Sequence, residues 1–284
     1  MGCVWDRRNL LALLMLLGCG IGMKVSDVTQ RGALGEYEPF GVIEADEPFD
    51  TLRHELVGRL RTKDKGLTLL CDYATVVDTA IGLARTLGAN VLKIDVHHSP
   101  TQLTSSCHRI EARLYKVNDA RPYEQQVVWW PQRRLVISDF RADTADRPFR
   151  AATYCGITYR AVRRSGGYQV VAQAYFDPEL SYFKQERNDI LVLEHEQVHF
   201  DLAELYARML RKRIADAKFT QGDIDSRLKR MFDEVYRELA IEQDRYDSDV
   251  YPDPTKQGLW NGTIASRLAE LEAFSDHSVK GSVR

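Results

Sequence analysis

The pattern of apolar and polar positions in the first half of the chain predicts a small unit of mixed helix and strand. Residues 76–87 repeat apolar side chains at the 3.6-residue period of a helix, and Gly88 is a typical residue to end it. Short apolar stretches typical of strands flank this helix at residues 56–60, 67–71, 91–96 and 110–115. The pattern therefore predicts a compact α+β unit.

The second half of the chain begins with strand patterns. Residues 155–161 and 168–176 alternate in polarity on either side of Gly166-Gly167, which predicts a β-hairpin. Two shorter strands are expected at residues 127–130 and 135–137.

Two long helices follow the predicted hairpin. The segment from about Lys184 to Ala217 has a helical pattern and contains neither proline nor glycine. A second helix is expected from Asp223 to about Tyr246, with an apolar stripe along one face. The second half therefore combines a hairpin with two helices.

The composition supports two folded cores. The chain has 284 residues, of which 44% are hydrophobic and 28% charged. These fractions are close to the averages of globular domains, and the length is about twice the usual 150 residues per domain. We therefore expect an α+β protein with an accessory domain at residues 45–117 and a second domain at residues 118–284.

The N-terminus has the pattern of a bacterial export signal. Two arginines precede the apolar run at residues 10–17, which is shorter than the roughly 20 residues of a membrane span. Leu16-Leu17-Gly18-Cys19 resembles the lipobox of lipoproteins, in which the cysteine is lipidated. A plain cleaved signal and an uncleaved anchor are the alternatives. We expect a signal peptide at residues 1–19, a tether at 20–44, and an exported protein held at the envelope membrane by its lipid alone.

The other cysteines suit an oxidising compartment. If Cys19 carries the lipid and Cys3 leaves with the leader, Cys71, Cys107 and Cys155 remain. We predict a disulfide between Cys71 and Cys107 because both lie in the first domain. Three buried free thiols are the alternative.

The charge balance argues against nucleic acid as a partner. The chain has 39 Lys and Arg against 41 Asp and Glu, a net charge of −2. It therefore has no bulk positive field to hold a phosphate backbone.

The most informative motif is His195-Glu196-Gln197-Val198-His199 within the first long helix. Residues four apart share one face of a helix, so both imidazoles can bind one metal ion. Glu196 is then placed as the general base for an attacking water. The helical wheel sets Leu191, His199, Leu202, Tyr206 and Met209 on the inward face with His195.

A catalytic zinc site needs a third protein ligand. Glu204 is nine residues after His195 and faces the other way round the helix. Glu242 lies within the apolar stripe of the second helix, where an unpaired carboxylate is costly without a cation, and is our first choice. Glu238 and Asp249 are the alternatives.

Glu238 and Glu242 could instead lie on a solvated helix edge and pair with Arg245. Three tyrosines, Tyr206, Tyr246 and Tyr251, could donate a hydrogen bond to a developing oxyanion, although each could equally be a core residue.

The segment from Leu193 to Arg208 closely resembles a bacterial family described as secreted zinc-dependent proteases. Asp201 departs from the extended zincin pattern, which usually has an apolar residue at that position. The resemblance extends over residues 135–271 and includes Ser138-Asp139-Phe140, Gly156-Ile157-Thr158-Tyr159, Ala174-Tyr175-Phe176, Ser181-Tyr182, Gln243…Tyr246-Asp247 and Gln257…Trp260.

This resemblance implies a zincin-like fold over residues 118–284, with antiparallel hairpin strands packed on the HExxH helix and a second long helix. It also implies zinc and an exported protein, but no particular substrate. Family members carry an acid at the position of Asp249 and often a histidine shortly after. Here Val250-Tyr251-Pro252-Asp253 follows, and no histidine occurs before His277. More loosely, segments around Asp72, Gly88 and His108 resemble small domains of bacterial envelope lipoproteins.

The sequence thus predicts a zinc-dependent peptidase of the bacterial envelope. His195 and His199 would be ligands, Glu196 the general base, and Glu242, or else Asp249 or Glu238, the third ligand. The substrate would be a peptide or protein that the sequence does not identify. The alternative function is a non-catalytic lipoprotein that binds a partner and keeps the HExxH helix as a structural or metal-binding element. Two histidines and a carboxylate also suit divalent ions other than zinc.

Overall fold

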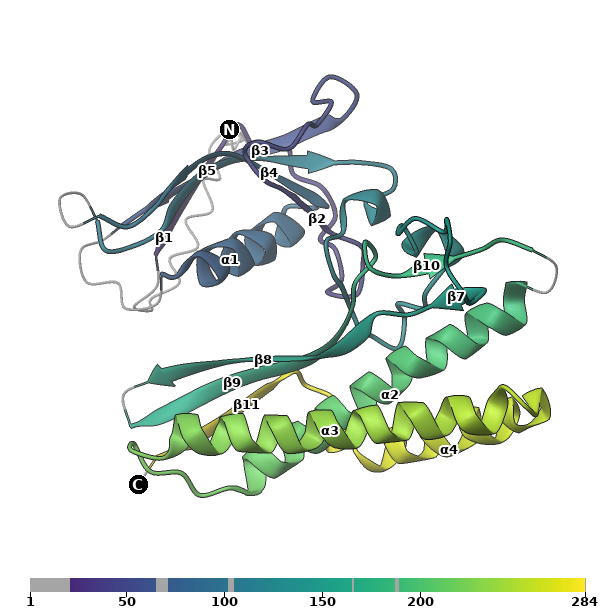
Figure 1. Cartoon of the computed structure of the whole chain (residues 1–284). Coiled ribbons are helices and arrows are strands. Elements are labelled where there is room, and N and C mark those ends of the chain that lie inside the picture. Colours follow the sequence, from purple (N-terminus) through teal and green to yellow (C-terminus); the bar gives the residue numbers. More distant parts are fainter. Residues whose placement is uncertain (1–20, 65–70, 102–104, 165, 187–188, 284) are drawn as a thin grey trace, which may run out of the picture.

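A computed structural model describes residues 21–64, 71–101, 105–164, 166–186 and 189–283, which form an N-terminal and a C-terminal α+β unit (Figure 1). The predicted signal peptide and Cys19 lie outside the described residues. Among the residues described, each helix is too short or too polar to cross a membrane. The α+β fold class predicted from the sequence is confirmed.

The N-terminal unit is a sheet covered on one face by a helix. Within the described residues the sheet has the order β1-β3-β5-β4-β2, antiparallel except for the parallel pair β2 and β4. The helix α1 (Tyr73–Thr86) buries Val76, Ala80 and Ala84 against the sheet. The strands are β1 (Gly22–Ser26), β2 (Gly41–Ile43), β3 (Glu55–Lys63), β4 (Val91–His98) and β5 (Arg109–Lys116).

This unit is larger than its hydrophobic pattern indicates. Residues 20–44 are not a plain tether, because β1 and β2 lie within this range and form both edges of the sheet. Edge strands bury only part of their side chains, so a short edge strand carries little apolar signal. Residues 67–70 of a predicted strand lie outside the described residues.

The disulfide between Cys71 and Cys107 is confirmed, with Cα atoms 5.0 Å apart. It joins the residue before the Asp72 cap of α1 to the segment that enters β5. Asp72 accepts a hydrogen bond from the Thr75 N–H, which satisfies one of the free donors at the start of the helix. Cys155 is a half-buried free thiol.

In the C-terminal unit three helices lie on one side of a sheet, and the first of them makes the main contact with it (Figure 1). The long hairpin of β8 and β9 turns at Gly166, whose φ of 72° suits glycine. Strands β11 and β6 pair with the other edge of β9, and β7 pairs with β10. The strands are β6 (Val127–Val128), β7 (Ala151–Ala152), β8 (Cys155–Arg164), β9 (Gly167–Phe176), β10 (Tyr182–Phe183) and β11 (Ser278–Ser282).

The core of this unit lies between the hairpin and α2 (Asp189–Asp216). Alternate residues of β9, from Tyr168 to Phe176, are buried against α2. The helix α3 (Ile224–Val250) lies beside α2, followed by α4 (Gln257–Glu270). Short 3-10 helices occupy Arg121–Tyr123, Ile137–Asp139, Pro254–Lys256 and Glu272–Phe274.

Two predicted elements differ from the structure. Residues 135–137 do not form a strand; this segment turns into a 3-10 helix because Asp139 accepts hydrogen bonds from the Val136 N–H and from buried Arg133. The first long helix begins at Asp189 rather than Lys184. Lys184 follows β10 directly, and its N–H donates to the carbonyl of Arg150.

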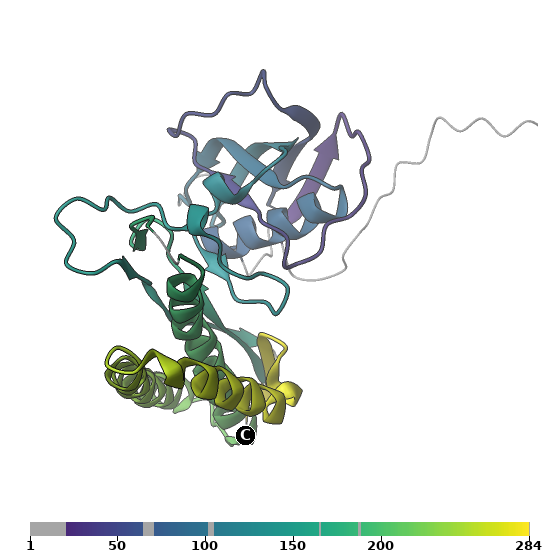
Figure 2. The same ribbon diagram turned by 90° about the vertical axis from the view of Figure 1, so that its right-hand side faces the viewer.

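The N-terminal unit lies on the side of the hairpin opposite α2, α3 and α4, as the two views show (Figure 1 and Figure 2). Arg160 on the outer face of β8 connects the units by a salt bridge of 2.5 Å to Asp78 of α1 and a contact of 3.3 Å with Thr75. The N-terminal unit therefore leaves the α2–α3 side of the sheet free.

Candidate metal centre

The helix α2 passes from solvent into the core at His195. None of residues 189–194 is buried, whereas every residue from His195 to Phe200 is. His195 and His199 are 9% and 8% exposed, and Glu196 between them is 3% exposed. The motif therefore occupies the point where the helix enters the protein.

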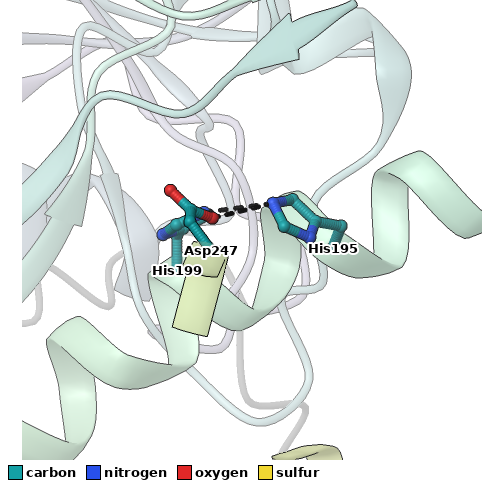
Figure 3. A group of neighbouring side chains, drawn as sticks. All are labelled: His195, His199 and Asp247. Atoms are coloured by element: carbon teal, nitrogen blue, oxygen red, sulfur yellow. Dashed lines mark hydrogen bonds and ion pairs between the residues drawn. The ribbon is translucent and has the colours of Figure 1, made fainter. Parts of the chain in front are cut away.

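Asp247, near the end of α3, completes a cluster with the two histidines (Figure 3). Its Oδ1 lies 3.2 Å from Nε2 of His195 and 3.0 Å from Nε2 of His199. The two Nε2 atoms are 3.3 Å apart. Two nitrogens and one oxygen therefore converge on one point from two helices.

These distances fit a metal ion better than a set of hydrogen bonds. Ligand atoms about 2.0–2.1 Å from a tetrahedral zinc lie roughly 3.3 Å from one another, close to the three distances found here. Asp247 Oδ1 is buried and has no hydrogen bond of ordinary geometry within the described part of the chain. A buried carboxylate oxygen without such a partner is costly unless a cation satisfies it. The residues present thus fit a divalent metal.

The electrostatics of the cluster keep the carboxylate ionised. Burial acts to raise the pKa of Asp247, but its contacts with His195 and His199 hold that pKa well below the usual range. Burial likewise acts to lower the pKa of His199, and the contact with Asp247 and the charge of Glu196 raise it above its ordinary value. Asp247 is therefore negatively charged, as a metal ligand must be.

A tyrosine contacts the ring nitrogen of His195 that faces away from Asp247. The hydroxyl of Tyr246 lies 3.0 Å from Nδ1 of His195 and donates to Oε1 of Gln257 at 2.6 Å. Because the hydroxyl of Tyr246 donates its proton to Gln257, its oxygen accepts a hydrogen bond from the Nδ1–H of His195. This tautomer leaves the Nε2 lone pair free for a metal.

The uncharged residues of the motif anchor α2. The Gln197 side chain accepts a hydrogen bond from the Leu135 N–H and donates to Asp201, both at 2.8 Å. Asp201 also accepts from Nε1 of Trp129 at 2.8 Å. The acid at position 201, where the zincin pattern usually has an apolar residue, thus ties α2 to the segment after β6.

Glu196 is buried without a partner. In the described residues its carboxylate has no hydrogen bond or ion pair, although its charge acts on His199, Tyr246 and Tyr251. A carboxylate that is not used by the fold is available to a ligand at the centre.

The structure brings none of the three predicted third ligands to the histidines. Glu242 accepts hydrogen bonds from Tyr206 and Arg267. Glu238 pairs with Arg213 at 2.7 Å, and Asp249 contacts Trp260 at 3.3 Å and Lys256 at 3.5 Å. Our first choice, Glu242, and both alternatives are therefore wrong for this structure, which places Asp247 there instead.

The error has a geometric cause. Glu242 is five residues before Asp247, about 7.5 Å along the helix axis, and it lies level with Tyr206 rather than with the histidines. A helical wheel identifies the face of α3 but not the level at which α2 crosses it. The sequence did contain a signal, because the segment ending in Tyr246-Asp247 belongs to the pattern shared with the resembled family.

Other predicted positions also differ. Leu191 is 63% exposed instead of facing inward. Glu204 is fully buried but lies away from the centre, paired with Arg208 at 3.0 Å and Arg211 at 2.5 Å. Tyr206 and Tyr246 use their hydroxyls within the fold, whereas the half-exposed Tyr251 has its ring 5.1 Å from the His195 ring.

Residues 188–251 match the family described as "Bacterial protein of unknown function (DUF922)". This range covers α2 and α3 and so contains all three residues of the cluster and Glu196. Comparisons with curated proteins and with solved structures gave no match. The region similar to this bacterial family thus includes the candidate centre.

Proposed function

We propose that this protein is a zinc-dependent metallopeptidase. The observation that carries the proposal is the convergence of His195, His199 and Asp247 beside the unpaired carboxylate of Glu196. Two imidazoles and one carboxylate are a ligand set used by catalytic zinc, with a fourth position left to water or substrate. A purely structural zinc site would be closed by a fourth protein ligand, whereas the described residues bring three ligand groups together here.

When bound, zinc supplies a Lewis acid that lowers the pKa of a water and polarises a substrate carbonyl. His195 and His199 would hold it through Nε2 and Asp247 through Oδ1. Tyr246 fixes the orientation of His195, and Gln257 fixes Tyr246. The protein thus prepares its ligands before the ion arrives, which reduces the cost of ordering them.

Glu196 is the general base in this proposal. It follows His195 directly on α2 and is buried, and its carboxylate has no hydrogen bond or ion pair with the described residues. It would accept the proton of the attacking water and return it to the leaving amine. Burial strengthens its electrostatic effect on the reacting groups because the local dielectric is low.

The strand β7 supports a peptide as the substrate. Among the described residues it pairs with β10 on one edge only. It also runs beside the motif, because Arg150 pairs with Asp189 at 2.6 Å and the Thr153 hydroxyl contacts the Glu196 carbonyl at 3.5 Å. An extended peptide can add to the unpaired edge of such a strand through main-chain hydrogen bonds.

The proposed location is the bacterial envelope, with lipid on Cys19 as the anchor. The support is the basic, apolar and lipobox pattern of residues 1–19 together with the disulfide between Cys71 and Cys107, which suits an oxidising compartment.

Metal analysis and peptide cleavage test this function together. The full chain, purified without chelator, should carry about one zinc per molecule, and a His195→Ala/His199→Ala variant almost none. A Glu196→Gln variant should keep its zinc and lose cleavage of a random-sequence peptide mixture by at least about a hundredfold. A wild type that stays folded and takes up no added zinc would refute the metal centre. A zinc-loaded wild type that cleaves no peptide would refute the peptidase.

A further inference from the structure

An exposed apolar surface adjoins the metal centre. The ring of Tyr251 lies 5.1 Å from the ring of His195 and is 58% exposed as a residue. Phe149, 59% exposed, stacks against Tyr251 with ring centres 6.5 Å apart. Leu191, 63% exposed, lies one helical turn before His195 on the same face of α2. We call these three residues the apolar wall.

The apolar wall is assembled from three separate parts of the chain. Phe149 lies just before β7, Leu191 is in the first turn of α2, and Tyr251 follows the last residue of α3. Single exposed apolar residues are common, but a group of them gathered at one site marks a surface that binds something. None of the three belongs to the buried core of this unit.

We propose that the apolar wall binds a bulky apolar side chain of the substrate peptide beside the bond that is cleaved. This proposal rests on the peptidase function above and adds a substrate class to it, namely peptides with a large aliphatic or aromatic residue at that position.

The position of the wall relative to β7 and His195 supports a peptide side chain as its occupant. A peptide added to the free edge of β7 would run past Phe149, and every second side chain of an extended peptide points the same way. One such side chain would meet Phe149 and Tyr251 while the neighbouring carbonyl lies near His195. Tyrosine and phenylalanine rings give a large contact area at a low entropic cost, because each has only two rotatable side-chain bonds.

The charge around the wall favours an uncharged residue. The carboxylates of Asp247 and Glu196 belong to the centre itself, and their charges act on Tyr251. Arg150 beside Phe149 is already paired with Asp189. An acidic side chain would be repelled by the two carboxylates, and a lysine would lose its hydration against three apolar residues.

Kinetics with defined peptides test the proposal. Peptides that differ at one position, with Leu, Phe, Ala, Asp or Lys next to the cleaved bond, are compared on the zinc-loaded full chain. We expect Tyr251→Ala and Leu191→Ala to lower kcat/KM by about tenfold or more for the Leu and Phe peptides and by less than about twofold for the Ala peptide. Matched controls are Tyr37→Ala, an exposed tyrosine of the N-terminal unit, and Leu259→Ala, an exposed leucine of α4.

A binding measurement separates this proposal from the function on which it rests. Labelled Leu and Ala peptides are titrated into zinc-loaded Glu196→Gln protein, and into the same protein without zinc, with fluorescence anisotropy as the readout. If the Leu peptide binds more tightly than the Ala peptide and Tyr251→Ala abolishes that difference, the apolar wall is supported. If no cleavage is seen in the same case, only the peptidase function is refuted. If the protein cleaves or binds peptides without a preference for Leu and Phe, the proposed role of the apolar wall is refuted and the peptidase function is not. The same conclusion follows if Tyr251→Ala leaves the preference intact.

Vesicles provide the remaining control. If Tyr251→Ala and Phe149→Ala reduce sedimentation of the chain with phospholipid vesicles and change no peptide preference, the surface contacts a membrane and the proposal is overturned.

Discussion

The hydroxyl of Tyr246 lies 3.0 Å from Nδ1 of His195, on the side of the ring opposite Asp247. This contact sets which nitrogen of His195 carries the proton and which faces the metal centre. Such outer contacts orient metal ligands, and losing one typically lowers metal affinity by about 10–100-fold.

A Tyr246→Phe variant should therefore bind zinc about 10–100-fold more weakly while remaining folded. The substitution leaves Nδ1 of His195 and Oε1 of Gln257 without their partner. Competition with a chromophoric chelator measures the affinity. Tyr236→Phe on the same helix, where the side chain is 40% exposed, is the matched control. Equal affinities for the two variants would show that the contact does not position the ligand.

The third ligand can be identified by single substitutions along α3. Asp247→Ala should remove most bound zinc, because only two protein ligands then remain. Glu242→Gln should retain it, since Glu242 is engaged with Tyr206 and Arg267. Asp249→Asn should retain it as well. Zinc content by mass spectrometry of the metal checks this, and loss of zinc in Glu242→Gln with retention in Asp247→Ala would contradict the structure.

The buried acid of α2 should matter for stability rather than for chemistry. Glu204 and Arg211 are both fully buried. Glu204→Ala leaves Arg211 without its carboxylate partner and leaves Arg208 paired only with the exposed Glu272. We expect a loss of about 3–5 kcal/mol in the free energy of unfolding, measured with urea. Asp216→Ala, which removes an exposed salt bridge with Lys212, should change it by at most about 1 kcal/mol. Similar small losses in both variants would show that the buried pair adds little.

Acid should destabilise the C-terminal unit through His277. Burial, together with the charge of Arg211, lowers the pKa of this histidine to about 4, and its ring lies 4.4 Å from Trp130. The unfolded chain takes up this proton near pH 6.5 and the folded chain only near pH 4, so the contribution of His277 to stability is lost as the pH falls through this range.

A His277→Gln variant should therefore lose less stability than wild type between about pH 7 and pH 5. Urea midpoints at the two pH values give the comparison. An identical pH dependence in both proteins would mean that His277 titrates normally in the folded state.

The sequence alone determined the fold class, the hairpin of β8 and β9, the two long helices and the spacing of the two histidines, and it favoured the disulfide over free thiols without excluding them. Each of these follows from a local pattern. Periodicity reports which side of a strand or helix is buried, and the i, i+4 spacing puts His195 and His199 on one face wherever the helix lies. The disulfide required only that Cys71 and Cys107 share a small domain.

Only the tertiary structure decided that Asp247 completes the centre, that β1 and β2 belong to the N-terminal sheet, and that Leu191 is exposed. The physical reason is the same in each case. Where two helices cross, which edge a short strand pairs with, and how far a helix projects beyond its neighbour depend on packing between distant segments. A periodic pattern indicates which side of its own helix or strand a residue faces. It does not indicate which residue of a neighbouring helix or strand lies opposite.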